Sequence, residues 1–184
     1  MFNLKKSALV NIILAALCAA FISVCSWISI PFTVPFTLQT FAIFGVLMLF
    51  GAKVGLLATV VYILLGLVGL PVFSGFKAGA GVLFGATGGY IIGFLFIGII
   101  FAVSQKIFGE KTVAQILSLF AGLAVCYAFG TVWFWAVYAS GSGQTTFAAA
   151  LTVCVLPFVI PDIVKLLLAA LIAKKLKPVV SKYR

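Results

Sequence analysis

Residues 112–161 read TVAQILSLFAGLAVCYAFGTVWFWAVYASGSGQTTFAAALTVCVLPFVIP, and none of them is charged. A membrane-spanning helix needs about 20 apolar residues, so this run is too long for one span and long enough for two. The polar segment SGSGQ at 140–144 predicts a turn within it. The stretch therefore predicts two consecutive transmembrane helices, and the second continues to about Lys174.

A second uncharged run, residues 7–52, is divided by Pro31 and Pro35 in the same way, because proline interrupts helices. Two further apolar runs complete the set. The sequence predicts six transmembrane helices, near 8–28, 38–51, 54–71, 87–105, 112–140 and 144–174.

The overall composition supports a membrane protein. Of 184 residues, 65% are hydrophobic and 8% are charged, whereas soluble domains carry about 25% charged residues. A chain of this size cannot hide so much apolar surface from water. We therefore expect an all-α integral membrane protein, forming one transmembrane domain over residues 1–184.

The basic residues predict the orientation. With the N-terminus inside and six spans, ten of the 12 basic residues fall on the cytoplasmic side, as the positive-inside rule expects. They are Lys5, Lys6, Lys53, Lys106, Lys111, Lys174, Lys175, Lys177, Lys182 and Arg184. Both termini are thus expected to be cytoplasmic. The net charge of +10 then reflects orientation and contact with membrane lipid, not nucleic-acid binding.

The shortage of titratable groups excludes several functions. The chain has two acids, Glu110 and Asp162, and no histidine, and its four cysteines lie within apolar runs. Metal sites and acid–base pairs need clusters of such residues, so we expect no catalytic residues, no metal and no cofactor. The chain also lacks a phosphate-binding loop of the G-x-x-x-x-G-K-[ST] type, so any ATP-driven step belongs to a partner.

Asp162 and Lys165 are the strongest candidates for a binding site. Three residues apart on a predicted helix, they share a face at the middle of a span, where charges are costly and normally face a cavity or a partner. One interpretation is an ion pair retained for packing. The other is a ligand contact with Lys165 as donor and Asp162 as acceptor, helped by backbone carbonyls freed at Pro157 and Pro161.

Two loops and one helix face leave alternatives open. The loop at 30–37, which includes Phe36, is either an apolar lid or an ordinary turn. The glycine-rich stretch at 73–81, which includes Gly79, lets the backbone approach a ligand or another helix, and Gly89 with Gly93 predicts helix packing. In the first helix, small residues recur at a spacing of four, which serves either internal packing or docking of a partner. These residues are Ala15, Ala16, Ala19 and Ala20.

Five motifs resemble, in the same order, those of the BioY family, the biotin-specific S-components of energy-coupling-factor (ECF) transporters. They are PFTLQTF at 35–41, GLPVFSG at 69–75, TGGYIIGF at 87–94, GTVWF at 130–134 and PFVIPDIVK at 157–165. The resemblance covers nearly the whole chain.

The resemblance implies a six-helix S-component fold in the plasma membrane of a prokaryote, with biotin near the outer face beneath the first and third loops. It also implies docking of the alanine face of the first helix on a transmembrane coupling protein that binds two ATPases. Asp162 would then accept hydrogen bonds from the ureido N–H groups, and Lys165 would donate to the ureido oxygen or to the carboxylate. The resemblance leaves open which end of biotin these two residues hold. Tyr90 and Gln39 are expected as further contacts because both lie near predicted outer helix ends. Gly79 and Phe36, from the two loops, are the other expected contacts.

The chain departs from the family pattern at three places. Ala86 stands where proline is usual, Pro161 where glycine is usual, and 76–80 lacks the uniform glycine run. Lys77 in that segment either meets the biotin carboxylate or is a solvated loop lysine. The alternatives are an S-component for another water-soluble vitamin, or a stand-alone secondary transporter with Asp162 as proton relay. The latter predicts repeated halves, which 1–92 and 93–184 do not show.

Overall fold

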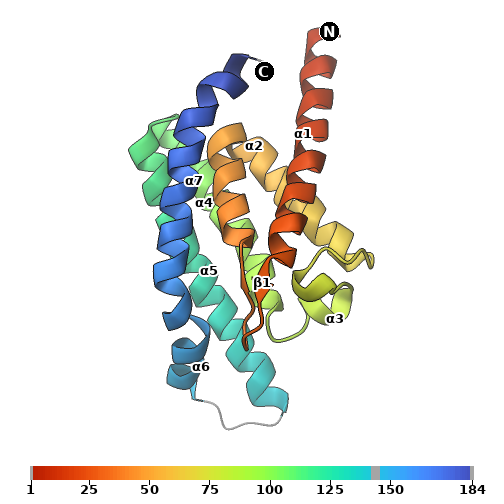
Figure 1. Cartoon of the computed structure of the whole chain (residues 1–184), viewed down its shortest axis with the longest axis vertical. Coiled ribbons are helices and arrows are strands. Elements are labelled where there is room, and N and C mark those ends of the chain that lie inside the picture. Colours follow the sequence, from red (N-terminus) through yellow and green to blue (C-terminus); the bar gives the residue numbers. More distant parts are fainter. Residues whose placement is uncertain (1, 142–145, 183–184) are drawn as a thin grey trace.

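The computed structural model describes residues 2–141 and 146–182, and these form a bundle of long helices (Figure 1). In chain order the elements are α1 (Phe2–Trp27), β1 (Ser29–Ile30), β2 (Phe36–Thr37), α2 (Gln39–Leu67), the 3-10 turn η1 (Ser74–Phe76), α3 (Ala80–Leu83), α4 (Gly88–Phe108), α5 (Thr112–Gly141), α6 (Phe147–Cys154) and α7 (Leu156–Lys182). Within the described ranges, five helical stretches are long and apolar enough to cross a membrane.

The expected six-helix arrangement is confirmed because α2 consists of two helices. Gly51 has φ 78° and ψ 172°, a conformation that favours glycine, and it separates residues 39–50 from 52–67. Figure 1 shows the two halves as the arms of a V. The Gln105 side-chain oxygen accepts a hydrogen bond from the Ala52 N–H at 2.9 Å, so the backbone group released by the break is satisfied.

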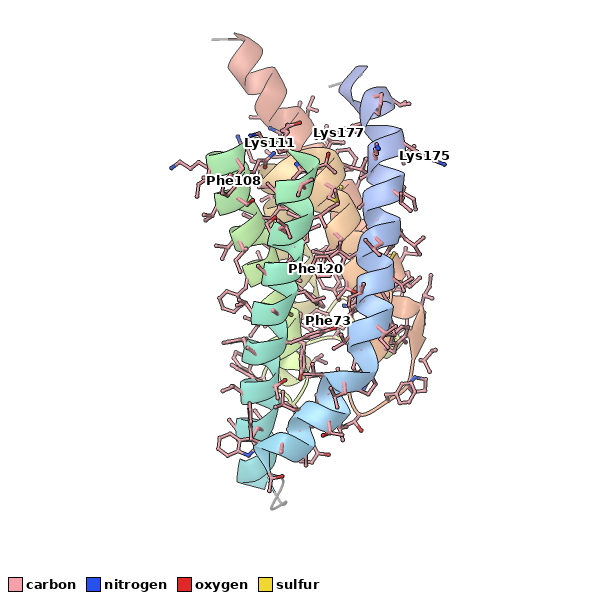
Figure 2. The ribbon with its side chains drawn as sticks, turned by 90° about the vertical axis from the view of Figure 1, so that its left-hand side faces the viewer. Phe73, Phe108, Lys111, Phe120, Lys175 and Lys177 are labelled. Atoms are coloured by element: carbon pink, nitrogen blue, oxygen red, sulfur yellow. The ribbon has the colours of Figure 1, made fainter. Side chains whose placement is uncertain are left out.

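The two ends of the bundle differ in character. The start of α1 and the end of α7 lie at the same end (Figure 1), which agrees with an even number of crossings. Figure 2 places Lys111, Lys175 and Lys177 at this end, which we call the basic end. Its assignment to the cytoplasm remains a prediction. Arg184 lies outside the described residues, as do the side chains of Lys5, Lys6 and Lys182.

Small residues bring α4 and α5 together. A methyl group added at Gly93 would approach the Cys126 sulfur at 2.7 Å, and one added at Gly89 would meet the Trp133 side chain. The predicted packing role of Gly89 and Gly93 is therefore confirmed. The core next to them is closely packed, since Ile97 and Leu119 are fully buried.

Some helix boundaries differ from the expected ones. The second half of α2 ends at Leu67 instead of near Pro71, because Gly69 adopts φ 104° and turns the chain. The last helix runs to Lys182 instead of Lys174 and tolerates Pro178 within its final turns. The turn predicted at 140–144 falls after α5, although 142–145 lie outside the described residues. A further break at Val155 separates α6 from α7. Pro157 is the second residue of α7 and lies in its first turn, where proline fits well.

Candidate functional site

A cavity of about 180 Å³ lies at the end of the bundle opposite the basic end. It is bounded by the starts of α2 and α4, by the middle of α5, and by α6 and α7. The hairpin formed by β1, β2 and their connection covers it from one side, and the long loop of residues 68–87 covers it from the other. Its volume is below the roughly 300–1,000 Å³ of typical drug-sized pockets, which suits a small solute.

Most of the cavity wall is apolar. Phe32 comes from the hairpin, Phe73 from the long loop, Phe94 from α4, Leu123 from α5 and Phe158 from α7. Such a wall favours an apolar ligand body, while a few placed polar groups fix its orientation.

Asp162 is the charged group of the cavity wall that is most deeply buried, at 3% exposed. Its Oδ1 accepts hydrogen bonds from the Thr40 hydroxyl at 2.9 Å and from the Lys165 ammonium at 2.8 Å. Its Oδ2 accepts one from the Tyr127 hydroxyl at 2.5 Å. A carboxylate offers about four acceptor positions, so one position remains for a ligand N–H.

Lys165 stands behind Asp162 and does not line the cavity. Besides Asp162, its ammonium donates to the Thr37 carbonyl oxygen at 2.6 Å and to the Thr40 hydroxyl at 3.4 Å. It also lies 4.0 Å from the centre of the Phe36 ring, within range of a cation–π interaction. A lysine ammonium has three donors, and all three are engaged here. The side chain therefore neutralises Asp162 and ties α7 to the hairpin.

Two further polar side chains of the wall are also held in place. The Gln39 oxygen accepts from the Thr37 hydroxyl at 2.8 Å, and its amide nitrogen donates to the Tyr62 hydroxyl at 2.5 Å. The Tyr90 hydroxyl is hydrogen-bonded to Thr131 at 3.0 Å. These groups are oriented before any ligand arrives, which lowers the entropic cost of binding.

The long loop is anchored to the end of α1. The Trp27 indole N–H donates to the Pro71 carbonyl at 2.9 Å, and its ring stacks on Phe76 with centroids 5.0 Å apart. The Ser26 hydroxyl is hydrogen-bonded to the Val72 carbonyl. These contacts hold Ser74 and Lys77 at the cavity, where Lys77 is exposed and Asp162 is buried.

The predicted ligand residues separate into two groups. Asp162, Tyr90 and Gln39 line the cavity, whereas Lys165, Phe36 and Gly79 do not. Neighbouring strand residues point to opposite faces, so Phe36 turns away because Thr37 faces the cavity. Its ring stacks instead on Phe158, with centroids 6.0 Å apart. Gly79 donates its backbone N–H to the Gly66 carbonyl at 2.7 Å and so fixes the loop.

Sequence reasoning missed several lining residues. Those with polar groups at the carboxylate are Thr40 and Tyr127. Thr40 lies within the quoted motif PFTLQTF, one residue from Gln39, so its position carried a signal. Tyr127 lies in an apolar run, and no pattern distinguished it.

The four alanines of α1 fall on two different faces. Ala15 and Ala19 are buried in the core, as expected if they serve internal packing. Ala16 and Ala20 are exposed. Among the described residues no cluster of His, Cys, Asp or Glu has the geometry of a metal site.

Comparison with known proteins identifies close relatives of this architecture. The model of the BioY family matches residues 3–182. The chain is 41% identical over 169 residues to the biotin transporter BioY of Thermotoga maritima, covering 91% of this chain and 95% of the relative. It is 39% identical to the probable biotin transporter BioY of Pyrococcus horikoshii, covering 89% and 94%.

A solved structure is also similar. It is the S-component for biotin from an ECF-type ABC transporter, which superposes with a TM-score of 0.81 at 25% sequence identity. The match covers 97% of this chain and 95% of the other.

Proposed function

This chain belongs to the BioY family, and on that basis we propose that it captures biotin for uptake as the substrate-binding S-component of an ECF-type importer. It is a multi-pass membrane protein and not an enzyme. The observation that carries the proposal is a cavity with a buried carboxylate that keeps one acceptor position for a ligand.

The ureido ring of biotin is proposed to lie against Asp162. This ring offers N–H donors, and the open acceptor position of Asp162 suits one of them. Lys165 has no donor left for a ligand, so it acts on biotin through Asp162, by holding the carboxylate in its orientation. Gln39 and Tyr90 are proposed as further polar contacts.

The carboxylate of biotin is proposed to point toward Lys77. An anion placed beside Asp162 would be repelled in a buried site, whereas Lys77 lies at the exposed edge of the same cavity. The aromatic wall between them, with Phe73 and Phe158, suits the bicyclic ring and the aliphatic chain. This orientation assigns Lys77 to the ligand and not to solvent alone.

Binding of labelled biotin to the purified protein in detergent tests the site. In Asp162→Asn, affinity should fall about 10- to 100-fold, because a charge-assisted hydrogen bond is lost. A monodisperse sample with a single cooperative unfolding transition is the control for folding, since the unpaired Lys165 ammonium should itself lower the unfolding temperature. Unchanged affinity in Asp162→Asn would place biotin elsewhere.

Biotinamide, in which a neutral amide replaces the carboxylate, tests the orientation. The protein should bind biotin up to about fivefold more tightly than biotinamide, and Lys77→Gln should remove this preference. Lys53→Gln is the matched control, because Lys53 is also exposed but lies next to the Gly51 turn at the basic end. An equal preference in Lys77→Gln and the unchanged protein would reverse the proposed orientation.

Two further experiments test the alternative functions, one for the identity of the vitamin and one for the energy source of uptake. A folded sample that binds another water-soluble vitamin and not biotin would indicate an S-component of different specificity. Uptake that survives the loss of ATP but stops with an uncoupler would favour the stand-alone, proton-coupled alternative.

We further propose that a transmembrane coupling protein, carrying two ATPases, docks on the exposed alanines of α1. Ala16 and Ala20 lie one helical turn apart and allow close approach of another helix, whereas Ala15 and Ala19 are already used inside the bundle. The docking face is therefore narrower than the four alanines suggest.

Ala20→Leu separates docking from binding. Biotin affinity in detergent should change less than about twofold, while ATP-dependent uptake with the energizing module should fall severalfold, because a bulky side chain blocks close helix approach. Ala148→Leu, which adds the same bulk to an exposed position on α6, is the matched control. Equal uptake by both variants would indicate that Ala20 faces lipid and does not contact the coupling protein.

A further inference from the structure

A polar cavity of about 290 Å³ lies at the basic end, away from the proposed biotin site. It is formed where the Gly51 turn of α2, the end of α4, the start of α5 and the end of α7 meet. Its polar side chains are Gln105, Glu110, Gln115 and Lys177. Nothing in the capture of biotin requires this cavity.

Gln115 gives the cavity the character of a site. It is 4% exposed and lines the cavity, yet no hydrogen bond joins its side-chain amide to another residue in the described part of the chain. No polar side-chain atom of the described residues is both sealed from solvent and unpaired, so the Gln115 amide is open to the cavity. A ligand in the cavity can therefore form hydrogen bonds with this amide in place of water.

Donors dominate this cavity. Lys177 donates to Glu110 at 2.8 Å and keeps two further N–H groups. The oxygen of Gln105 already accepts from Ala52, so its NH₂ group is the part left to a ligand. Five more described lysines lie near the ends of the helices at this end of the bundle, against the single acid Glu110. They are Lys53, Lys106, Lys111, Lys174 and Lys175. The chemistry suits an anion with several oxygens, such as a phosphate ester.

An apolar groove of about 320 Å³ adjoins the polar cavity. It runs between α1, the first half of α2 and α7, and it is lined by Phe21, Phe41, Gly45 and Leu176, among others. Leu49 lines both the groove and the polar cavity, and Leu176 precedes Lys177 directly. From Phe41 to Phe50 the groove extends about 13 Å along α2, close to the roughly 15 Å hydrocarbon depth of one leaflet.

We propose that these two features together bind one anionic phospholipid, with an acyl chain in the apolar groove and the phosphate in the polar cavity. The groove fixes the position of the acyl chain. Since hydrocarbon surrounds an acyl chain in the bilayer as well, selectivity comes from Lys177, Gln105 and Gln115 at the phosphate. The charge of the basic end selects an anionic head group over a zwitterionic one.

Native mass spectrometry of the detergent-purified full chain tests the proposal. Phosphatidylglycerol and phosphatidylcholine with identical acyl chains are titrated separately. One phosphatidylglycerol should bind in preference to phosphatidylcholine, and Lys177→Gln should weaken it about fivefold. Lys175→Gln is the matched control, because it removes the same charge two residues away on the opposite side of α7 (Figure 2).

The groove is tested at Gly45. A methyl group added there meets nothing within 4 Å, so Gly45→Leu fits the fold while filling the space of the acyl chain, and it should lower lipid occupancy severalfold. Ala148→Leu is the control for added bulk, and retained biotin binding is the control for folding.

Three outcomes would overturn the proposal. If Lys175→Gln and Lys177→Gln weaken the binding of phosphatidylglycerol equally, the preference would come from the general surface charge and not from a site at Lys177. Equal binding of both lipids would contradict the preference for an anionic head group over a zwitterionic one. A dimer that dissociates in Gly45→Leu would assign the groove to a second copy of the chain.

Discussion

The two acids of this chain form ion pairs of identical length in opposite surroundings. Asp162 and Lys165 lie 2.8 Å apart within the bundle, with side chains 4% and 8% exposed. Glu110 and Lys177 also lie 2.8 Å apart, at the basic end, with side chains 65% and 36% exposed. Distance alone would rank the two pairs as equal.

Burial determines what each pair can do. Water screens the Glu110–Lys177 pair, and exposed pairs contribute about 0–1 kcal/mol. The Asp162–Lys165 pair is removed from water, so its charges depend on one another and on hydrogen bonds from Thr40 and Tyr127. A buried pair is costly to form, and this cost supports the proposed role of the Asp162 carboxylate in ligand binding.

The largest expected effect comes from Lys165→Met. Removing one partner of a buried pair leaves an uncompensated charge, which costs about 3–5 kcal/mol. We expect the unfolding temperature in detergent to fall by roughly 10 °C and biotin binding to be lost.

The double variant Lys165→Met with Asp162→Asn separates charge from packing. It removes both charges, so it should recover much of the unfolding temperature without recovering biotin binding. A double variant no more stable than Lys165→Met would show that Lys165 acts by its packing and its bonds to the hairpin.

Sequence reasoning found the buried pair because its members belong to one helix. A spacing of three residues places Asp162 and Lys165 on a shared face, and the cost of charge in a membrane marks them as unusual. Thr40 lies 122 positions from Asp162 and Tyr127 lies 35 positions away, so their contacts depend on how different helices pack. Local periodicity carries no information of that kind.

The same limit applies to the loops and to α1. Proline and glycine marked the covering segments correctly, but composition does not show which side chain turns inward. Phe36 was expected at the ligand and faces Lys165 and Phe158 instead. The spacing of the alanines likewise indicated two overlapping faces, and only packing shows that Ala15 and Ala19 belong to the core.

The next expected effect, at Tyr127→Phe, tests the neighbours of the buried pair. The variant removes one hydroxyl that donates to Asp162 and preserves the ring. Because hydrogen bonds to charged groups contribute about 1.5–3 kcal/mol, biotin affinity should fall about 10- to 100-fold if the oriented carboxylate holds the ligand. Isothermal titration in detergent measures this change.

Tyr138→Phe is the matched control for Tyr127→Phe. Tyr138 also lies on α5, but its side chain is 43% exposed and does not line the cavity. Equal affinities in the two variants would mean that Asp162 is positioned sufficiently by Thr40 and Lys165.

The smallest expected effect completes the comparison at the basic end. Glu110→Gln removes one charge of the exposed pair and leaves the side-chain volume nearly unchanged. The unfolding temperature should change by no more than about 2–4 °C, since water replaces the lost partner of Lys177. Biotin affinity should be unchanged, and any stability difference should shrink further at high ionic strength because salt screens exposed charges. A loss comparable to that of Lys165→Met would show that the exposed pair holds the ends of α4, α5 and α7 together, and that burial is a poor guide to the importance of an ion pair in this fold.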